Sequence, residues 1–101
     1  MNVRQFYNKN QFIITDGKKI VFQSYDSTIA EINENGKLKF FSDWDYSKTT
    51  LKHLYLFLSD YKNEINTNQY KEIFSKDFET SKNKKAFLQN LINKKIIKLE
   101  Q

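Results

Sequence analysis

Four short runs rich in β-branched and aromatic residues fill the chain from residue 11 to residue 41. These runs predict strands at residues 11–15, 18–24, 27–33 and 37–41. Asp16-Gly17 separates the first two runs, and Asn35-Gly36 separates the last two. Both dipeptides are typical of hairpin turns, because glycine readily adopts the positive φ that such turns need. The pattern therefore predicts a four-stranded antiparallel meander.

The apolar spacing becomes helical after residue 47. Ser47 is well placed to cap a helix, and apolar residues from Leu51 and Leu54 onward recur on one face. We expect this helix to be central and to pack on the sheet. A second, shorter helix is predicted from one shared apolar face: Tyr70, Ile73, Phe74 and Phe78. A third, capped by Thr80 or Ser81, is predicted from another: Phe87, Leu88, Leu91 and Ile92.

These elements predict one α+β domain over residues 1–101: a four-stranded antiparallel meander followed by a central helix, two shorter helices and a short C-terminal strand at 95–99. The sheet and central helix occupy residues 1–62, and a lysine-rich helical extension occupies residues 63–101. The expected core consists of inward-facing apolar residues: Phe12, Ile14, Ile20, Phe22, Ile29, Ile32, Leu38, Phe40, Leu51, Leu54, Leu58, Ile73, Phe74, Leu88 and Leu91.

Composition removes several classes of protein. The absence of cysteine excludes disulfides, thiolate metal sites and cysteine nucleophiles. No run approaches the roughly 20 apolar residues of a membrane-spanning helix, and residues 1–11 lack the apolar core of a signal peptide. We therefore expect a cytoplasmic protein without membrane contacts. The net charge is +5, and all but Arg4 of the 17 cationic side chains are lysines, which argues against sequence-specific reading of DNA bases.

Groups suited to catalysis are scarce. His53 is the only histidine and falls within the central helix, where a surface or boundary position is its commoner role. Asp43 and Asp45 form a D-x-D pair that can hold Mg²⁺ or Ca²⁺, although aspartates before a helix more often cap its free amides. Gly17 and Gly36 lie in separate hairpins and form no phosphate-binding loop. We expect no enzymatic activity, no cofactor and no metal site.

The loop before the central helix is better suited to binding. Asp43, Trp44, Asp45 and Tyr46 place two aromatic side chains beside two carboxylates. This combination is typical of a protein-binding hot spot, so we predict this loop as the partner-binding site. The alternative for Trp44 is burial in the core, the commoner place for the only tryptophan of a small domain.

A second candidate surface is the lysine-rich third helix and the segment after it. Five lysines make up the candidate set: Lys82, Lys84, Lys85, Lys94 and Lys95. A lysine face of this kind can follow the phosphate backbone of a nucleic acid, with an affinity that falls as salt rises. The alternative is a solvated helix face without a ligand.

Three segments between residues 7 and 58 resemble a family of short, largely uncharacterised proteins of phages and mobile elements in low-GC bacteria. They are YNKNQFII, VFQSYDSTIAEI and DWDYSKTTLKHLYLFL, in this order. The most specific part is the loop and helix start, Trp44-Asp45-Tyr46-Ser47. The resemblance brings no catalytic motif with it, so no functional residue is carried over.

The resemblance implies a small protein made inside an infected bacterial cell, where such proteins commonly act on host defence. The function it implies is non-enzymatic inhibition of a host defence effector by stoichiometric binding, as anti-CRISPR proteins do. The partner would be a host protein such as a CRISPR nuclease or its guide RNA complex, bound by a monomer or a homodimer. The alternative is a small nucleic-acid-binding regulatory protein of a phage or mobile element that uses the lysine-rich helix face.

Overall fold

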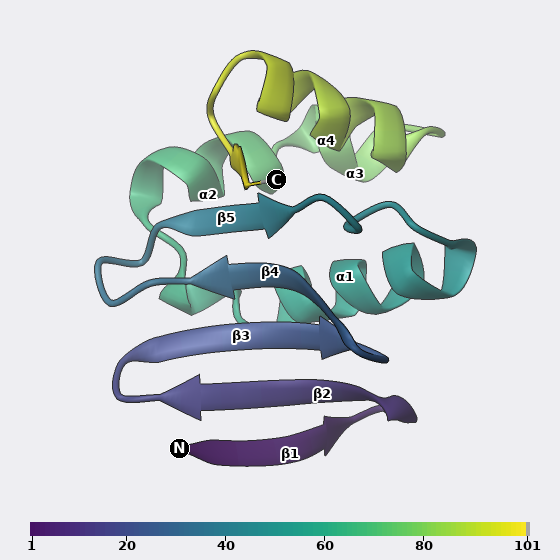
Figure 1. The fold of residues 1–101 in the computed structure, drawn as a ribbon. Coiled ribbons are helices and arrows are strands. Elements are labelled where there is room, and N and C mark those ends of the chain that lie inside the picture. The colour runs from purple at the N-terminus through teal and green to yellow at the C-terminus, as the bar shows by residue number, and fades with distance from the viewer. Residues whose placement is uncertain (101) are drawn as a thin grey trace.

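The computed structural model describes residues 1–100 and places six strands in one sheet (Figure 1). They are β1 (Asn2–Phe6), β2 (Asn8–Asp16), β3 (Lys19–Ser24), β4 (Ser27–Ile32), β5 (Leu38–Phe41) and β6 (Lys98–Glu100). Their spatial order follows the chain, from β1 at one edge to β6 at the other. Neighbours are antiparallel except β5 and β6, which are parallel. The α+β class, the four-stranded meander and the C-terminal strand are thus confirmed.

Tight turns join the strands of the meander. Asp16 pairs with Lys19, so the turn between β2 and β3 begins at Gly17, one residue later than expected. Gly17 has a φ of +63°, as the first turn residue of a type II′ hairpin requires. The loop between β4 and β5 contains Gly36 at a φ of +79°. The Asn33 side-chain oxygen accepts two backbone N–H groups within this loop and so fixes its shape.

The described part of the chain contains four α-helices and one short 3-10 helix. They are α1 (Lys48–Asp60), the 3-10 helix η1 (Lys62–Glu64), α2 (Thr67–Ile73), α3 (Lys76–Thr80) and α4 (Lys84–Asn93). Ser47 caps α1 as expected, because its Oγ accepts the Thr50 N–H at 3.1 Å. Within residues 1–100, no helix combines the length and the apolar content needed to cross a membrane.

The two shorter helices differ in their boundaries from those expected. The second is divided into α2 and α3, because Ser75 accepts the Phe78 N–H at 3.2 Å and begins a new helix. The third begins later than expected: Asn83, and not Thr80 or Ser81, caps α4. Serine and asparagine compete with the helix for backbone groups, which makes them effective starts but poor interior residues.

The edge strand β1 lies outside the four strands expected. It pairs with β2, and Phe6 at its end is 1% exposed. Two hydrogen bonds also connect this part of the chain to the end of α1: Arg4 of β1 donates to the Tyr61 hydroxyl, and the hydroxyl of Tyr7, which directly follows β1, donates to Asp60 at 2.8 Å. Because residues 2–6 are mostly polar, contacts with β2 and α1, and not local periodicity, make this segment a strand.

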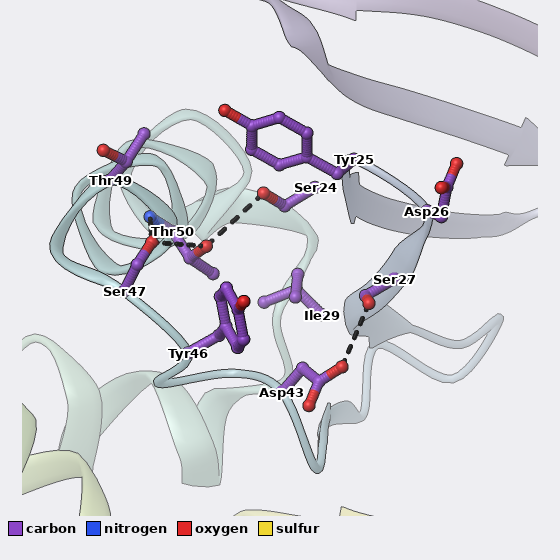
Figure 2. A pocket seen from close by; sticks show the side chains of 10 residues that line it. All are labelled: Ser24, Tyr25, Asp26, Ser27, Ile29, Asp43, Tyr46, Ser47, Thr49 and Thr50. Atoms are coloured by element: carbon purple, nitrogen blue, oxygen red, sulfur yellow. Dashed lines mark hydrogen bonds between the residues drawn. The ribbon is translucent and has the colours of Figure 1, made fainter.

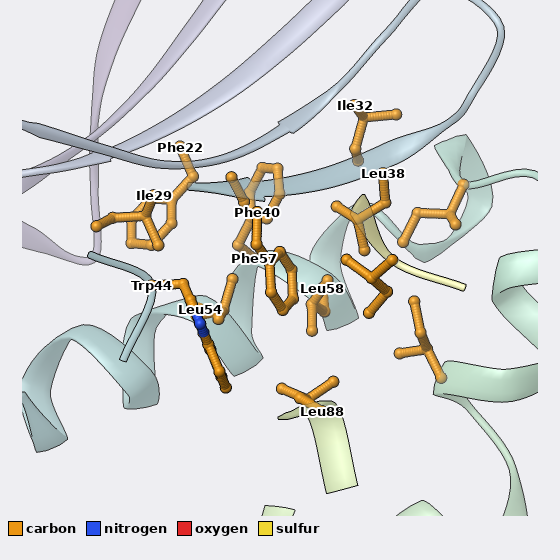
Figure 3. Packing of buried hydrophobic residues seen from close by; sticks show 14 of the residues in the cluster. Phe22, Ile29, Ile32, Leu38, Phe40, Trp44, Leu54, Phe57, Leu58 and Leu88 are labelled. Carbon is orange, nitrogen blue, oxygen red and sulfur yellow. The ribbon is translucent and has the colours of Figure 1, made fainter. Parts of the chain in front are cut away.

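One hydrophobic core lies between the sheet and the helices (Figure 3). Phe22 and Phe40 reach it from the sheet, Leu54 and Phe57 from α1, and Leu88 from α4. All five side chains have no exposed surface. The core therefore includes residues from both the meander and the C-terminal helices.

The expected facing of β2 is wrong. Gln11 and Ile13 are both 1% exposed, whereas Phe12 and Ile14 lie on the opposite face and are only partly buried. Side chains alternate along a strand, so an error of one residue moves the whole set to the other face. The rest of the expected core is buried, except three residues that are partly buried against it: Ile20, Leu51 and Phe74.

Gln69 of α2 connects the sheet to the chain after α4. Its Oε1 accepts the Leu38 N–H at 2.6 Å, and its Nε2 donates to the Leu38 carbonyl at 2.9 Å. Nε2 also donates to the Ile96 carbonyl at 2.9 Å. The Gln69 side chain is 3% exposed, so water has little access to these backbone groups.

We expect Gln69→Ala to lower the free energy of unfolding by about 2–4 kcal/mol, because the two buried backbone groups of Leu38 and the partly buried Ile96 carbonyl lose their partner. Urea unfolding followed by circular dichroism measures the loss. Gln89→Ala is the matched control, since the Gln89 amide bonds only the exposed Asn93 side chain, and its effect should stay within about 0.5 kcal/mol. Equal losses in the two variants would contradict the bridging role of Gln69.

Candidate partner-binding site

The loop expected to bind a partner lies between β5 and α1. Backbone hydrogen bonds fold it tightly: the Trp44 N–H donates to the Phe41 carbonyl at 3.0 Å, and the Tyr46 N–H donates to the Asp43 carbonyl at 3.1 Å. Ser47 then caps α1. The loop residues therefore have defined backbone positions, but their side chains have different surroundings.

Trp44 belongs to the core. Its side chain is 2% exposed, and its ring stacks on Phe40 with centroids 5.4 Å apart. Trp44 and Leu54 of α1 belong to the same buried hydrophobic cluster (Figure 3). The expectation that Trp44 contacts a partner is therefore wrong, and the alternative, burial in the core, is confirmed. The physical reason is the large apolar area that an indole removes from water when it closes a small core.

The two aspartates of the loop bind separate neighbours. Asp43 accepts the Ser27 hydroxyl at 3.0 Å, and Asp45 lies 3.6 Å from the Lys85 ammonium of α4. Neither caps α1, contrary to expectation, because Ser47 does so. Within residues 1–100, no three acidic or histidine side chains gather into a group that could hold a metal ion.

Asp43 and Tyr46 line a cleft between the β3–β4 turn and the amino end of α1 (Figure 2). We call it the β3–α1 cleft; Ile29 and Ser47 also line it, and its volume is about 490 Å³. Six further residues line the cleft that the sequence did not indicate as partner-binding residues: Ser24, Tyr25, Asp26, Ser27, Thr49 and Thr50. Its size falls within the range of ligand pockets, roughly 300–1,000 Å³.

Hydroxyl groups form the floor of the cleft (Figure 2). Ser47 Oγ donates to Thr50 Oγ1 at 3.1 Å, and Thr50 Oγ1 lies 3.5 Å from Ser24 Oγ. Ser24 and Thr50 are both buried. Gln11 pairs with Ser24 across β2 and β3, and its buried Oε1 has no hydrogen-bond partner within residues 1–100. The polar floor thus continues into the core.

Two exposed tyrosines stand at the rim of the cleft. Tyr46 is 79% exposed and Tyr25 is 57% exposed. Figure 2 shows their rings on either side of the contact between Ser24 and Thr50. Both side chains are therefore available to a molecule that enters the cleft.

Tyr25 also has an unusual backbone. Its φ is +53°, a left-handed conformation that costs a residue other than glycine about 1–2 kcal/mol. The backbone is held there because the Tyr25 N–H donates to the Asn10 carbonyl at 2.7 Å and Gln23 Nε2 donates to the Tyr25 carbonyl at 2.8 Å. In the sequence, the one feature that indicates a turn conformation at Tyr25 is its place between the two predicted strands that become β3 and β4.

His53 is buried and not at the surface. Its side chain is 5% exposed, and its Nδ1 lies 2.8 Å from the Thr49 carbonyl oxygen, to which it donates as the Nδ1–H tautomer. It does not line the β3–α1 cleft. The expected surface or boundary position of His53 is therefore wrong, because α1 turns this residue toward the sheet.

Two of the five candidate lysines already have partners. Lys84 Nζ lies over the Phe78 ring, 5.0 Å from its centroid, and donates at 3.0 Å to the Phe78 carbonyl. It also donates to the carbonyls of Glu79 and Ser81, so it closes the end of α3. Lys85 forms the ion pair with Asp45.

The other three candidate lysines are exposed but widely spaced. Lys82 lies before the amino end of α4, whereas Lys94 and Lys95 follow its carboxyl end. The ten residues of α4 separate the two ends by about 15 Å. The five lysines therefore lie at two ends of a helix and do not form one continuous face along it.

Comparison with known protein families gives one match. The sequence model of DUF8033, a family of unknown function, matches residues 1–79. This span contains every residue that lines the β3–α1 cleft, and it ends before the five candidate lysines. Comparison with curated proteins and with solved structures gives no match.

Proposed function

This chain belongs to DUF8033, a family of unknown function, and we propose that it is a non-enzymatic protein that binds a partner protein with the rim of the β3–α1 cleft. The observation that carries this proposal is the pair of exposed tyrosines, Tyr25 and Tyr46, on two sides of one cleft. Tyrosine is enriched among the residues that dominate binding energy in protein interfaces. The Ser47 cap of α1 and the short β3–β4 turn fix the backbone at both tyrosines before a partner arrives, which lowers the entropic cost of binding.

The surroundings of the cleft support binding over catalysis. Acid–base catalysis at neutral pH most often uses histidine. His53, the only histidine of the chain, is buried outside the cleft lining, and its Nδ1 donates to the Thr49 carbonyl. The hydroxyls of Ser24 and Thr50 lie against each other in the floor, and within residues 1–100 neither forms a hydrogen bond with His53.

We propose a host defence effector, in particular a guide-loaded CRISPR nuclease, as the partner. The support for this target is the resemblance of residues 7–58 to small phage and mobile-element proteins. An inhibitor of this kind needs a rigid surface that blocks a channel or holds a moving domain, and it needs no active site. The lysine distribution gives the nucleic-acid alternative less support, because Lys84 and Lys85 are already bound within the chain.

Affinity capture tests the binding surface. The tagged full chain is incubated with a lysate of a low-GC bacterium that carries CRISPR nucleases, and washed at low and at high salt. We expect a protein to survive the high-salt wash, and Tyr46→Ala to reduce its recovery about tenfold. Tyr70→Ala is the control, because Tyr70 lies on α2 away from the cleft. Recovery of nucleic acid alone, released as salt rises, would replace this proposal by the nucleic-acid alternative. A Tyr46→Ala variant that retains the protein would refute the assigned surface.

A cleavage assay tests the proposed target. Purified guide-loaded CRISPR nucleases of low-GC bacteria are mixed with the chain at rising molar ratios before DNA is added. We expect one of them to lose cleavage near an equimolar ratio, as stoichiometric inhibition requires, and Tyr46→Ala to need about tenfold more protein. If all of them cleave normally at large excess of the chain, the inhibitor proposal fails.

A further inference from the structure

The β3–α1 cleft differs in charge from the molecule as a whole. The chain carries a net charge of +5, yet Asp26 and Asp43 are both among the residues that line the cleft, with Asp26 at its edge (Figure 2). Within residues 1–100, no lysine, arginine or histidine lines it, and neither carboxylate takes part in an ion pair. Two unpaired carboxylates in one concave site favour a cation as its occupant.

The amino end of α1 adds an opposing but smaller charge. A helix terminus carries about half an elementary positive charge. Ser47 reduces its effect in the cleft, because its Oγ already accepts the Thr50 N–H. Two full negative charges therefore outweigh the helix end, and an anion such as phosphate would meet net repulsion.

Hydrogen-bond acceptors face the cleft from its side and its floor. Ser27 donates to Oδ2 of Asp43, which fixes the carboxylate and leaves Oδ1 without a hydrogen bond within residues 1–100. The hydroxyl oxygens of Ser24 and Thr50 lie in the floor. An occupant with several donors spread in a plane would satisfy acceptors in these different directions.

The aromatic rim selects among cations. Tyr25 and Tyr46 present exposed rings on two sides of the cleft. A guanidinium is planar, weakly hydrated and able to stack on aromatic faces, whereas an ammonium is compact and strongly hydrated. Tyr25 presents its ring here although its φ of +53° would suit glycine better, so backbone strain does not favour a tyrosine at this position.

We propose that the β3–α1 cleft receives an arginine side chain of the partner protein, with its guanidinium stacked against Tyr25 and Tyr46 and hydrogen-bonded to Asp43. This inference rests on the proposed function, in which the same rim contacts a partner protein. It adds the chemical group that the partner must present.

Titration of the ¹⁵N-labelled full chain with N-acetyl-L-arginine amide, followed by amide chemical shifts, tests the proposal. We expect saturable shifts confined to residues 24–27 and 43–50. The citrulline analogue has nearly the same shape without the charge, and we expect it to bind about tenfold more weakly. The lysine analogue should also bind more weakly, because it cannot stack as a plane.

Three variants separate binding from folding. Asp43→Asn keeps the shape of the side chain and an oxygen that accepts the Ser27 hydroxyl. It should lower the affinity for N-acetyl-L-arginine amide about tenfold. Asp16→Asn, at an exposed carboxylate outside the cleft, should leave the affinity unchanged. Tyr25→Gly should weaken binding while its urea midpoint stays at or above that of the parent chain, because glycine relieves the positive φ. A purely structural role for Tyr25 would lower that midpoint.

Several results would overturn the arginine assignment: no saturable shifts in the cleft, shifts spread over carboxylates elsewhere, equal binding of citrulline or lysine, or an unchanged affinity of Asp43→Asn. The proposed function has its own tests with the partner protein. If capture and inhibition depend on Tyr46 but the arginine probe does not bind, the arginine assignment alone fails. If no partner is captured, the proposed function fails, whereas the titration of the full chain still decides whether the cleft binds arginine.

Discussion

Phe57→Ala is expected to lower the free energy of unfolding by about 3–5 kcal/mol, the usual range for removing a buried phenylalanine. Phe57 has no exposed surface. Its ring stacks on Phe22 of β3 with centroids 5.5 Å apart and meets Phe6 of β1 edge-on at 6.5 Å. One side chain of α1 thus packs against two strands, and its removal leaves a cavity that the sheet cannot close by a local shift. Chemical unfolding followed by circular dichroism measures the loss.

Phe12→Ala is the matched control for this prediction. The same atoms are removed from β2, but Phe12 lies on the face of the sheet opposite the helices and is only partly buried. We expect a loss of about 1 kcal/mol, since no enclosed cavity forms. A loss as large as that of Phe57→Ala would show that the core lies on the other face of β2.

Gly36→Ala is expected to lower the free energy of unfolding by about 2–4 kcal/mol. Gly36 has a φ of +79°, where alanine is strained. An added Cβ would also lie 2.9 Å from the Glu64 carbonyl oxygen and 3.2 Å from the Asn66 nitrogen. Both neighbours are backbone atoms, and the Asn66 N–H donates to the Gly36 carbonyl at 2.7 Å. The methyl group therefore forces apart a contact between the β4–β5 loop and the start of α2.

Gly17→Ala separates the backbone strain at positive φ from the steric contact of the added Cβ. Gly17 has a φ of +63°, but an added Cβ meets no atom within 4 Å. This variant should lose only the conformational part, about 1 kcal/mol. Thermal or urea unfolding of both variants measures the difference. Equal losses would mean that the loop moves freely away from Glu64 and that the contact with the start of α2 contributes nothing.

Local signals in the sequence were sufficient for much of the fold. Two glycine turns, the alternation of Leu38 and Phe40, and the Ser47 cap each depend on neighbours within a few residues, and each is present in the structure. β1 was not predicted, because such local signals are absent from it. Its five residues carry no strong pattern of their own, and they form a strand only because β2 offers an edge.

The candidate site was only half predictable. Asp43 and Tyr46 stood out as part of an acidic and aromatic loop, and both line the β3–α1 cleft. Trp44, chosen by the same pattern, is buried, because composition does not state which way a side chain points. Tyr25 and Asp26 were missed, since they lie in a turn that ordinary hairpin signals do not distinguish from any other.

By itself, the sequence determined the α+β class, the four-strand meander and the central helix, because turn residues and apolar periodicity act on the backbone within a few residues. It also determined the absence of disulfides, because the chain contains no cysteine. The tertiary structure alone decided which face of β2 is buried, that Trp44 closes the core, and that the β3–β4 turn meets the amino end of α1. These features depend on strand register and on contacts between different elements, such as Ser24 with Thr50 and Ser27 with Asp43, which form only when the whole sheet has formed. The cleft and its charge therefore belong to the fold and not to any one segment of the chain.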